Sequence, residues 1–184
     1  MTAAVVALLL MSAGAGAIAA RTGTEGRAGM ARAAVPAVLL GVAAVVALAA
    51  PTTGGAGLAA VRVAAVVAAM SGGSALATAA FTLAGATGSV VPRANNEAEP
   101  SETVVPIEEP LRGGLTIGVL ERAAIAVCIL TNFAAGLAVI VAAKGLARYP
   151  ELRNPGAAEQ FIIGTFVSVL WACACAGVAV AIAR

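Results

Sequence analysis

The few ionisable side chains of this chain are the first place to look for chemistry. In a sequence that is 61% hydrophobic and 11% charged, Glu121 and Arg122 stand side by side, and no further charge follows until Lys144. At about 100° per residue, Glu121 shares a helix face with Cys128 and Asn132. Ionisable groups inside a hydrocarbon layer are costly and are usually functional. This face is therefore the first candidate site.

The same residues also fit a position at a membrane surface. The apolar run 123–143 is about 30 Å of helix, which is one hydrocarbon thickness. A crossing can therefore begin just after Arg122, and charged side chains near helix ends reach back to the interface. Asn132 would then only bond a neighbouring helix as packing glue. The intramembrane site and the interfacial anchor both remain open.

The position of Glu121 predicts a partner elsewhere in the chain. Adjacent helix residues point about 100° apart, so Arg122 is poorly placed to neutralise Glu121. We expect Glu121 to be partly shielded and paired with a cation on another stretch, with Arg112 and Arg93 as candidates. Arg122 instead falls on the face of Phe133.

Other kinds of chemistry lack their residues. The chain has no histidine and three cysteines, all in apolar runs, so we expect no metal site and no cofactor. The net charge of +2 is too small and scattered for a nucleic-acid partner. The basic segment carrying Lys144, Arg148 and Arg153 could bind an anion, but such helix-flanking cations are typical interfacial anchors. These observations favour a protein that is not an enzyme.

The long apolar blocks predict an all-α integral membrane bundle of about five transmembrane helices. A crossing helix needs roughly 20 apolar residues, and the blocks lack the alternation of barrel strands. A 58–91 helix would run through "SGGS" (71–74) and could be tilted or kinked there. The high arginine and alanine content is typical of a GC-rich bacterial genome, so we expect a multi-pass protein of the bacterial inner membrane, with the lipid bilayer as its partner. The predicted helices are 2–20, 33–50, 58–91, 115–143 and 159–183.

Three regions follow from these blocks. Residues 1–91 form an N-terminal three-helix membrane region, 92–114 an acidic loop rich in proline and glutamate, and 115–184 a C-terminal transmembrane hairpin. The first block could instead be a cleaved signal peptide, but no lysine or arginine precedes it.

Small residues predict how the last two helices meet. Close approach of helices in a membrane requires small side chains at i and i+4. We expect an antiparallel hairpin that is closest along two ridges, Ala134, Ala138 and Ala142 on one helix and Gly164, Ser168 and Ala172 on the other. One bilayer thickness would then separate Tyr149, Arg148 and Arg153 at one surface from Glu121 and Arg122 near the other. With five crossings and the N-terminus outside, the cytoplasmic side carries seven arginines and the other side four cations, a weak agreement with the positive-inside rule.

A resemblance covers about residues 114–180. The order "ER", a long apolar run, "AAKGLARYPEL" and "AEQFIIGTFVS" resembles the C-terminal two-helix part of an uncharacterised family of bacterial multi-span membrane proteins, a domain of unknown function. The resemblance implies a helical membrane fold and no particular reaction. The shared residues are Glu121, Arg122, Lys144, Arg148, Glu159, Gly164, Thr165 and Ser168.

Two functions are compatible with this pattern. The first is a non-enzymatic structural or partner-binding membrane component, which associates with copies of itself or with another membrane protein through its small-residue faces. The alternative is a small ion or solute transporter or channel subunit that uses Glu121 and Asn132. The location of Glu121, at lipid headgroups or beside a polar cavity, discriminates between them.

Overall fold

The chain folds as an all-α helical bundle, as expected. The computed structural model describes residues 1–23, 26–85, 114–149, 151–153 and 155–184, and the acidic loop with Arg93 and Arg112 lies outside these ranges. Four of the described helices, α1, α2, α3 and α6, are long and apolar enough to cross a membrane. The elements are α1 (Thr2–Thr22), α2 (Gly26–Ala49), α3 (Gly55–Leu83), α4 (Gly114–Leu130), α5 (Ala134–Ala147), the 3₁₀ turn η1 (Glu151–Arg153) and α6 (Pro155–Ala181).

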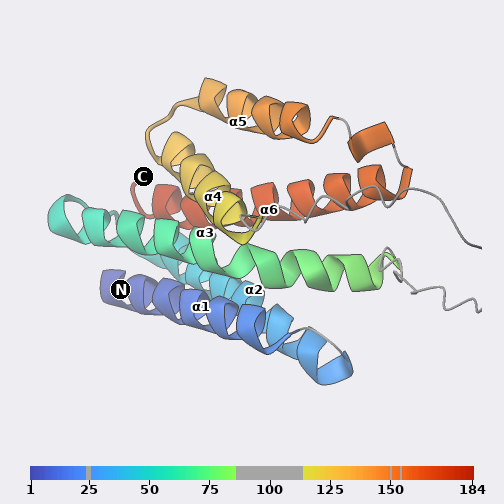
Figure 1. Ribbon diagram of the computed structural model, residues 1–184. Helices are drawn as coiled ribbons and strands as arrows, with labels where there is room; N and C mark the ends of the chain where they lie inside the picture. The colour runs from blue at the N-terminus through green and yellow to red at the C-terminus, as the bar shows by residue number, and fades with distance from the viewer. Residues whose placement is uncertain (24–25, 86–113, 150, 154) are drawn as a thin grey trace, which may run out of the picture.

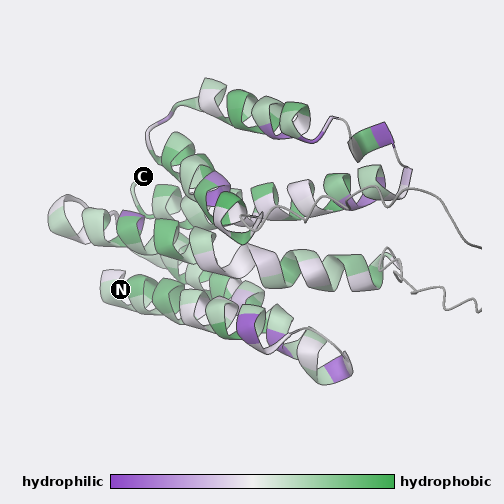
Figure 2. Ribbon diagram, viewed as in Figure 1, coloured by the Kyte–Doolittle hydropathy of each residue, from purple (hydrophilic) through white to green (hydrophobic). Residues whose placement is uncertain are grey.

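Several helices begin before the apolar blocks that predict them, whereas α3 ends at Leu83 rather than at the predicted residue 91. Helix α2 begins at Gly26 rather than near Ala33, so its first two turns carry Arg27 and Arg32. Hydropathy marks the part of a helix that lies in hydrocarbon, whereas backbone hydrogen bonding continues into the polar flank. Figure 2 shows hydrophobic residues along most of every helix, with hydrophilic ones near the α1–α2 connection, on α4 and around η1.

Helix α3 is the centre of the bundle. It runs unbroken through the "SGGS" segment and packs against α1, α4 and α6. The crossing with α1 is so close that a Cβ built on Gly16 would lie 2.6 Å from the Cα of Gly72. The core around α3 consists largely of alanine with a few larger side chains such as Leu9 and Val61. Small residues let the backbones approach, and that approach is the main source of packing energy between helices in lipid.

The predicted fourth helix is two helices, which corrects the sequence prediction. Helix α4 ends at Leu130 and α5 begins at Ala134, with Asn132 between them at φ 57°. The backbone N–H of Phe133 donates to the carbonyl of Cys128 at 2.7 Å, and that of Asn132 to Ile129 at 3.1 Å. This pair of bonds is a Schellman C-cap, with asparagine at the left-handed position usually held by glycine. The chain therefore turns back inside its apolar run.

The break at Asn132 changes the end of the bundle at which the C-terminus lies. Both termini lie at the same end of the bundle (Figure 1). The hydroxyls of Thr2 and Thr53 are 2.9 Å apart, and the N–H of Thr53 donates to the carbonyl of Ile182 at 3.0 Å. If each of the four long helices crosses once and α4–α5 returns as a hairpin, the number of passes is even, which differs from the five crossings expected from the sequence.

Candidate functional site

Arg122 is the most deeply buried charged residue that the structure describes. It is 3% exposed, and its guanidinium lies against the middle of α3. Its Nε donates to the carbonyl of Ala69 at 3.0 Å, and its Nη2 to that of Met70 at 2.9 Å. Its Nη1 donates more weakly to Ser168 Oγ on α6, at 3.5 Å. Sequence reasoning assigned the inward position to Glu121, so the burial of Arg122 corrects it.

The "SGGS" segment of α3 makes room for this contact. A Cβ built on Gly73 would lie 2.5 Å from Arg122 Cδ, and one built on Gly72 would lie 2.3 Å from Trp171 Cζ2. The Trp171 indole also donates to α3, to the carbonyl of Ala68 at 3.1 Å. Three successive carbonyls of α3 thus accept from side chains of α4 and α6. The two glycines expose these carbonyls, because any side chain there would occupy the space of the donors.

Glu121 is paired with Lys144. The carboxylate accepts from the ammonium group of Lys144 on α5, and both side chains are mostly shielded. The expectation of a shielded Glu121 with a cationic partner on another stretch agrees with this contact, whereas the candidates Arg112 and Arg93 lie outside the described residues. The pair also contradicts the expected separation of these charges by a bilayer. Because the hairpin turns back after α4, the end of α5 returns to the beginning of α4.

A cavity of about 310 Å³ with cations in its wall lies among α3, α4, α5 and α6. Three cations line it, namely Arg122, Lys144 and Arg148. We call it the cationic cavity. Hydroxyl groups and small or aromatic residues complete its wall, and the other lining residues are Ser74, Ala77, Gly114, Leu115, Gly118, Phe161, Gly164, Thr165 and Ser168.

Thr165 is a residue that sequence reasoning did not select as a site residue. Its Oγ1 is buried and has no hydrogen-bond partner among the described residues. Four other threonines on the helices bond the carbonyl four residues earlier in their own helix, namely Thr22, Thr78, Thr82 and Thr131. A threonine hydroxyl normally takes this local bond, so residue type and spacing do not distinguish Thr165 from the others, although it is one of the residues named for the family resemblance.

The remaining candidate residues divide between core and surface. Gly164, Ser168 and Ala172 face the bundle: Gly164 packs on Phe81 and Ala172 is fully buried. The opposite ridge, Ala134, Ala138 and Ala142, is exposed, so its expected contact with α6 is wrong. The reason is again the break, since α4 rather than α5 lies along α6.

Asn132 and the basic segment lie on the surface. The expectation that Asn132 faces inward is wrong, because Asn132 is exposed at the helix break. Tyr149 and Arg153 are also exposed, as interfacial residues would be. No group of three or more metal-ligating side chains is found within the described ranges.

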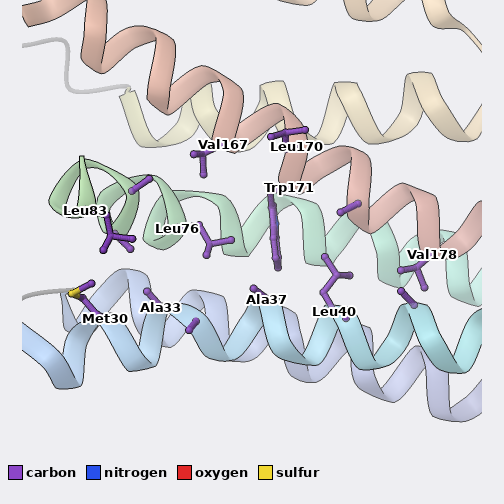
Figure 3. A pocket seen from close by; sticks show the side chains of 16 residues that line it. Met30, Ala33, Ala37, Leu40, Leu76, Leu83, Val167, Leu170, Trp171 and Val178 are labelled. Carbon is purple, nitrogen blue, oxygen red and sulfur yellow. The ribbon is translucent and has the colours of Figure 1, made fainter. Parts of the chain in front are cut away.

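A second hollow is apolar and lies on a different side of the α3–α6 contact. Figure 3 shows this groove between α2 and α6, with Trp171 standing across its middle and Met30 near Leu83 at one end. Its volume is about 720 Å³, and no ionisable residue lines it. We call it the apolar groove. It offers no group for chemistry, but it can hold an acyl chain or a helix.

Seven of the eight residues named for the expected resemblance lie at the cationic cavity, whereas Glu159 does not line it. Arg122, Lys144 and Arg148 line it from α4 and α5, Gly164, Thr165 and Ser168 line it from α6, and Glu121 pairs with one of its cations. Comparison with family models, with curated proteins and with solved structures found no match.

Proposed function

We propose that this chain is a non-enzymatic, multi-pass protein of a bacterial inner membrane that binds a small charged solute in the cationic cavity, as a transport component. The observation that carries the proposal is the buried Arg122 at a cavity lined by cations, between two helices of membrane-crossing length, α3 and α6, and the shorter α4 and α5. Charge inside a membrane protein is expensive, and where it faces a cavity it commonly marks a substrate pathway. The sequence predicted a pathway that uses Glu121 and Asn132. Because Asn132 is exposed, the proposed pathway uses the cationic cavity together with Glu121.

The distribution of cations supports one orientation. Because both termini lie at one end, the connections after α1 and α5 lie at the other. Six described cations lie in or beside the connections at that end, namely Arg21, Arg27, Arg32, Lys144, Arg148 and Arg153, whereas the terminal end has Arg62 and Arg184. By the positive-inside rule, the end that holds the connections after α1 and α5 is cytoplasmic, and both termini are outside. The five-crossing arrangement gave a weaker asymmetry, because it divided these basic segments between the two sides.

Thiol labelling tests whether the cavity is open to water. In a chain whose three cysteines are replaced by serine, Ala77→Cys lines the cationic cavity and Ala37→Cys lines the apolar groove. A membrane-impermeant maleimide is expected to label Ala77→Cys in inside-out vesicles and to leave Ala37→Cys unlabelled, because thiols in hydrocarbon do not ionise. Failure to label Ala77→Cys from either side would contradict a solute-binding function.

A second candidate is the structural or partner-binding role. It is favoured by the apolar groove and by the exposed alanine ridge on α5, both of which suit a helix of another chain. Disulfide crosslinking of Ala138→Cys between copies in native membranes, with an exposed position on the same helix such as Val139→Cys as control, tests it. Specific crosslinking at position 138 together with an unlabelled Ala77→Cys would favour this role over solute binding.

A further inference from the structure

The cationic cavity has the features of a site for an oxyanion. Resting on the proposed solute-binding function, we propose that it takes a phosphate or carboxylate group, which Arg122 and Lys144 attract and the Thr165 hydroxyl completes. No comparison assigns a ligand to these residues, and the sequence pattern suggested an anion only for the basic segment that begins at Lys144.

Arg122 has no salt bridge to a described carboxylate. The Glu121 carboxylate contacts Lys144, and Arg148 has an interaction of its own. No described carboxylate lies within ion-pairing distance of Arg122, whose described bonds go to two carbonyls and one hydroxyl. A guanidinium has five N–H donors, so part of its hydrogen-bonding capacity is unused. An anion with several acceptor oxygens supplies both the missing charge and the missing acceptors.

Thr165 supplies an independent observation. The residue is 8% exposed, lines the cavity, and keeps a hydroxyl without a partner in the described structure. Leaving a buried donor unmatched costs about 1–3 kcal/mol. Threonines elsewhere on these helices avoid this cost by bonding their own helix. A bound oxyanion removes the cost by accepting from the hydroxyl.

The wall beside the guanidinium is open enough to admit such a group. A Cβ built on Gly118 would lie 3.3 Å from Arg122 Nη1, so the glycine leaves this edge of the guanidinium uncovered by a side chain. The cavity volume of about 310 Å³ is at the small end of ligand sites, which run from about 300 to 1,000 Å³. This volume suits a small solute or the headgroup of an anionic lipid rather than a large substrate.

The single tryptophan provides a reporter of binding. Trp171 donates to the carbonyl of Ala68, and Arg122 donates to the next carbonyl, that of Ala69. The full chain in phosphatidylcholine nanodiscs is titrated with inorganic phosphate and, separately, with acetate, while its fluorescence is followed. Sodium chloride at equal ionic strength is the reference. In a parallel arm, nanodiscs containing phosphatidylglycerol are compared with phosphatidylcholine nanodiscs without added phosphate.

Two results are expected to support the site. In the first, Trp171 emission changes saturably with phosphate or acetate. In the second, Trp171 emission already differs in phosphatidylglycerol nanodiscs, and added phosphate or acetate causes no further change. The first outcome identifies a free solute and the second a lipid headgroup, and both support an oxyanion site. The proposal would be overturned if the response in every arm were no larger than the response to chloride, because ionic screening alone would then explain the change in emission.

Thr165→Val separates a ligand donor from a structural residue. The substitution keeps the shape and removes the hydroxyl, so the unliganded protein should be as stable as wild type or more so. A hydrogen bond to an anion contributes about 1.5–3 kcal/mol, so affinity should fall about tenfold or more. The control is Thr82→Val, whose hydroxyl bonds the Thr78 carbonyl on its own helix and does not line the cavity. Equal affinities for the two variants would overturn the role of Thr165.

Failure of this inference is distinguishable from failure of the proposed function. If Ala77→Cys is labelled from the aqueous phase but no oxyanion acts on Trp171, the cavity binds another class of solute and only the oxyanion site is refuted. If Ala77→Cys is never labelled, solute binding itself is refuted, whatever the lipid arm gives.

Discussion

Replacing Gly72 by alanine tests whether close packing on α3 holds the bundle together. A Cβ at this position would lie 2.3 Å from Trp171 Cζ2 and 2.6 Å from Cε2. Ordinary van der Waals contact between carbons begins near 3.5 Å, so the indole must move by about 1 Å. Trp171 is nearly buried and is tethered to Ala68, so that movement also strains its hydrogen bond.

The magnitude follows from three opposing terms. Overpacking typically costs about 1–3 kcal/mol, and a weakened hydrogen bond adds about 1 kcal/mol. Alanine is better than glycine within a helix by about 1 kcal/mol. The net expectation is a loss of about 1–3 kcal/mol, or several degrees in Tm for a chain of this size. Trp171 emission should also shift in the folded state.

Gly177→Ala is the matched control on α6. A Cβ there meets nothing within 4 Å, so only the gain in helix propensity remains, and Tm should stay the same or rise. Thermal unfolding of both variants in one mild detergent provides the comparison. If Gly72→Ala were as stable as Gly177→Ala, α3 and α6 would not pack as closely as described here, and the placement of Arg122 would lose its support.

Three further predictions concern the hairpin and the topology. Glu121→Gln should lower the free energy of unfolding by about 1–3 kcal/mol, between the values for exposed and buried pairs, and adding Lys144→Gln should recover most of it in the same melting assay. Asn132→Val should lose about 1–2 kcal/mol because a β-branched residue is strained at positive φ, whereas an equally stable Asn132→Gly would agree with the C-cap. Protease-sensitive tags at the two termini should be cut from the same side of oriented vesicles; cutting from opposite sides would refute the even number of passes.

Much of the fold could be predicted because one physical rule dominates it. A backbone in hydrocarbon must satisfy its own hydrogen bonds, so long apolar blocks become helices whatever their detailed sequence. Hydropathy is an average over many residues, however, and it passed over Asn132 within the 115–143 block. The relevant signal was local: asparagine tolerates the left-handed conformation that closes a Schellman cap. Whether Asn132 continues a helix or closes a C-cap is decided by the tertiary packing of the two flanking helices.

The candidate site was less predictable because it depends on that break. The expected shielding of Glu121 rested on a helix face that included Asn132, which is exposed at the break, and its partner Lys144 is near only when the chain turns back. Arg122 was placed by a helical wheel that continued through Phe133, and the wheel is meaningless beyond the end of α4. The carbonyls that bind Arg122 carry no sequence signal beyond the glycines that uncover them. Residue type and spacing gave no reason to separate Thr165 from threonines that bond their own helix, and the family resemblance named it without a role.

The C-cap at Asn132 connects fold and candidate site. An uninterrupted helix from Gly114 to Ala147 would be about 50 Å long at 1.5 Å per residue. Lys144 would then lie about 35 Å from Glu121 along the helix axis, and the cavity would lose two of its three cations. The turn brings the end of α5 back over the beginning of α4, where α6 and the glycines of α3 already hold Arg122. Asn132 is exposed and does not line the cavity, yet the gathering of positive charge around Arg122 depends on the conformation that this asparagine adopts.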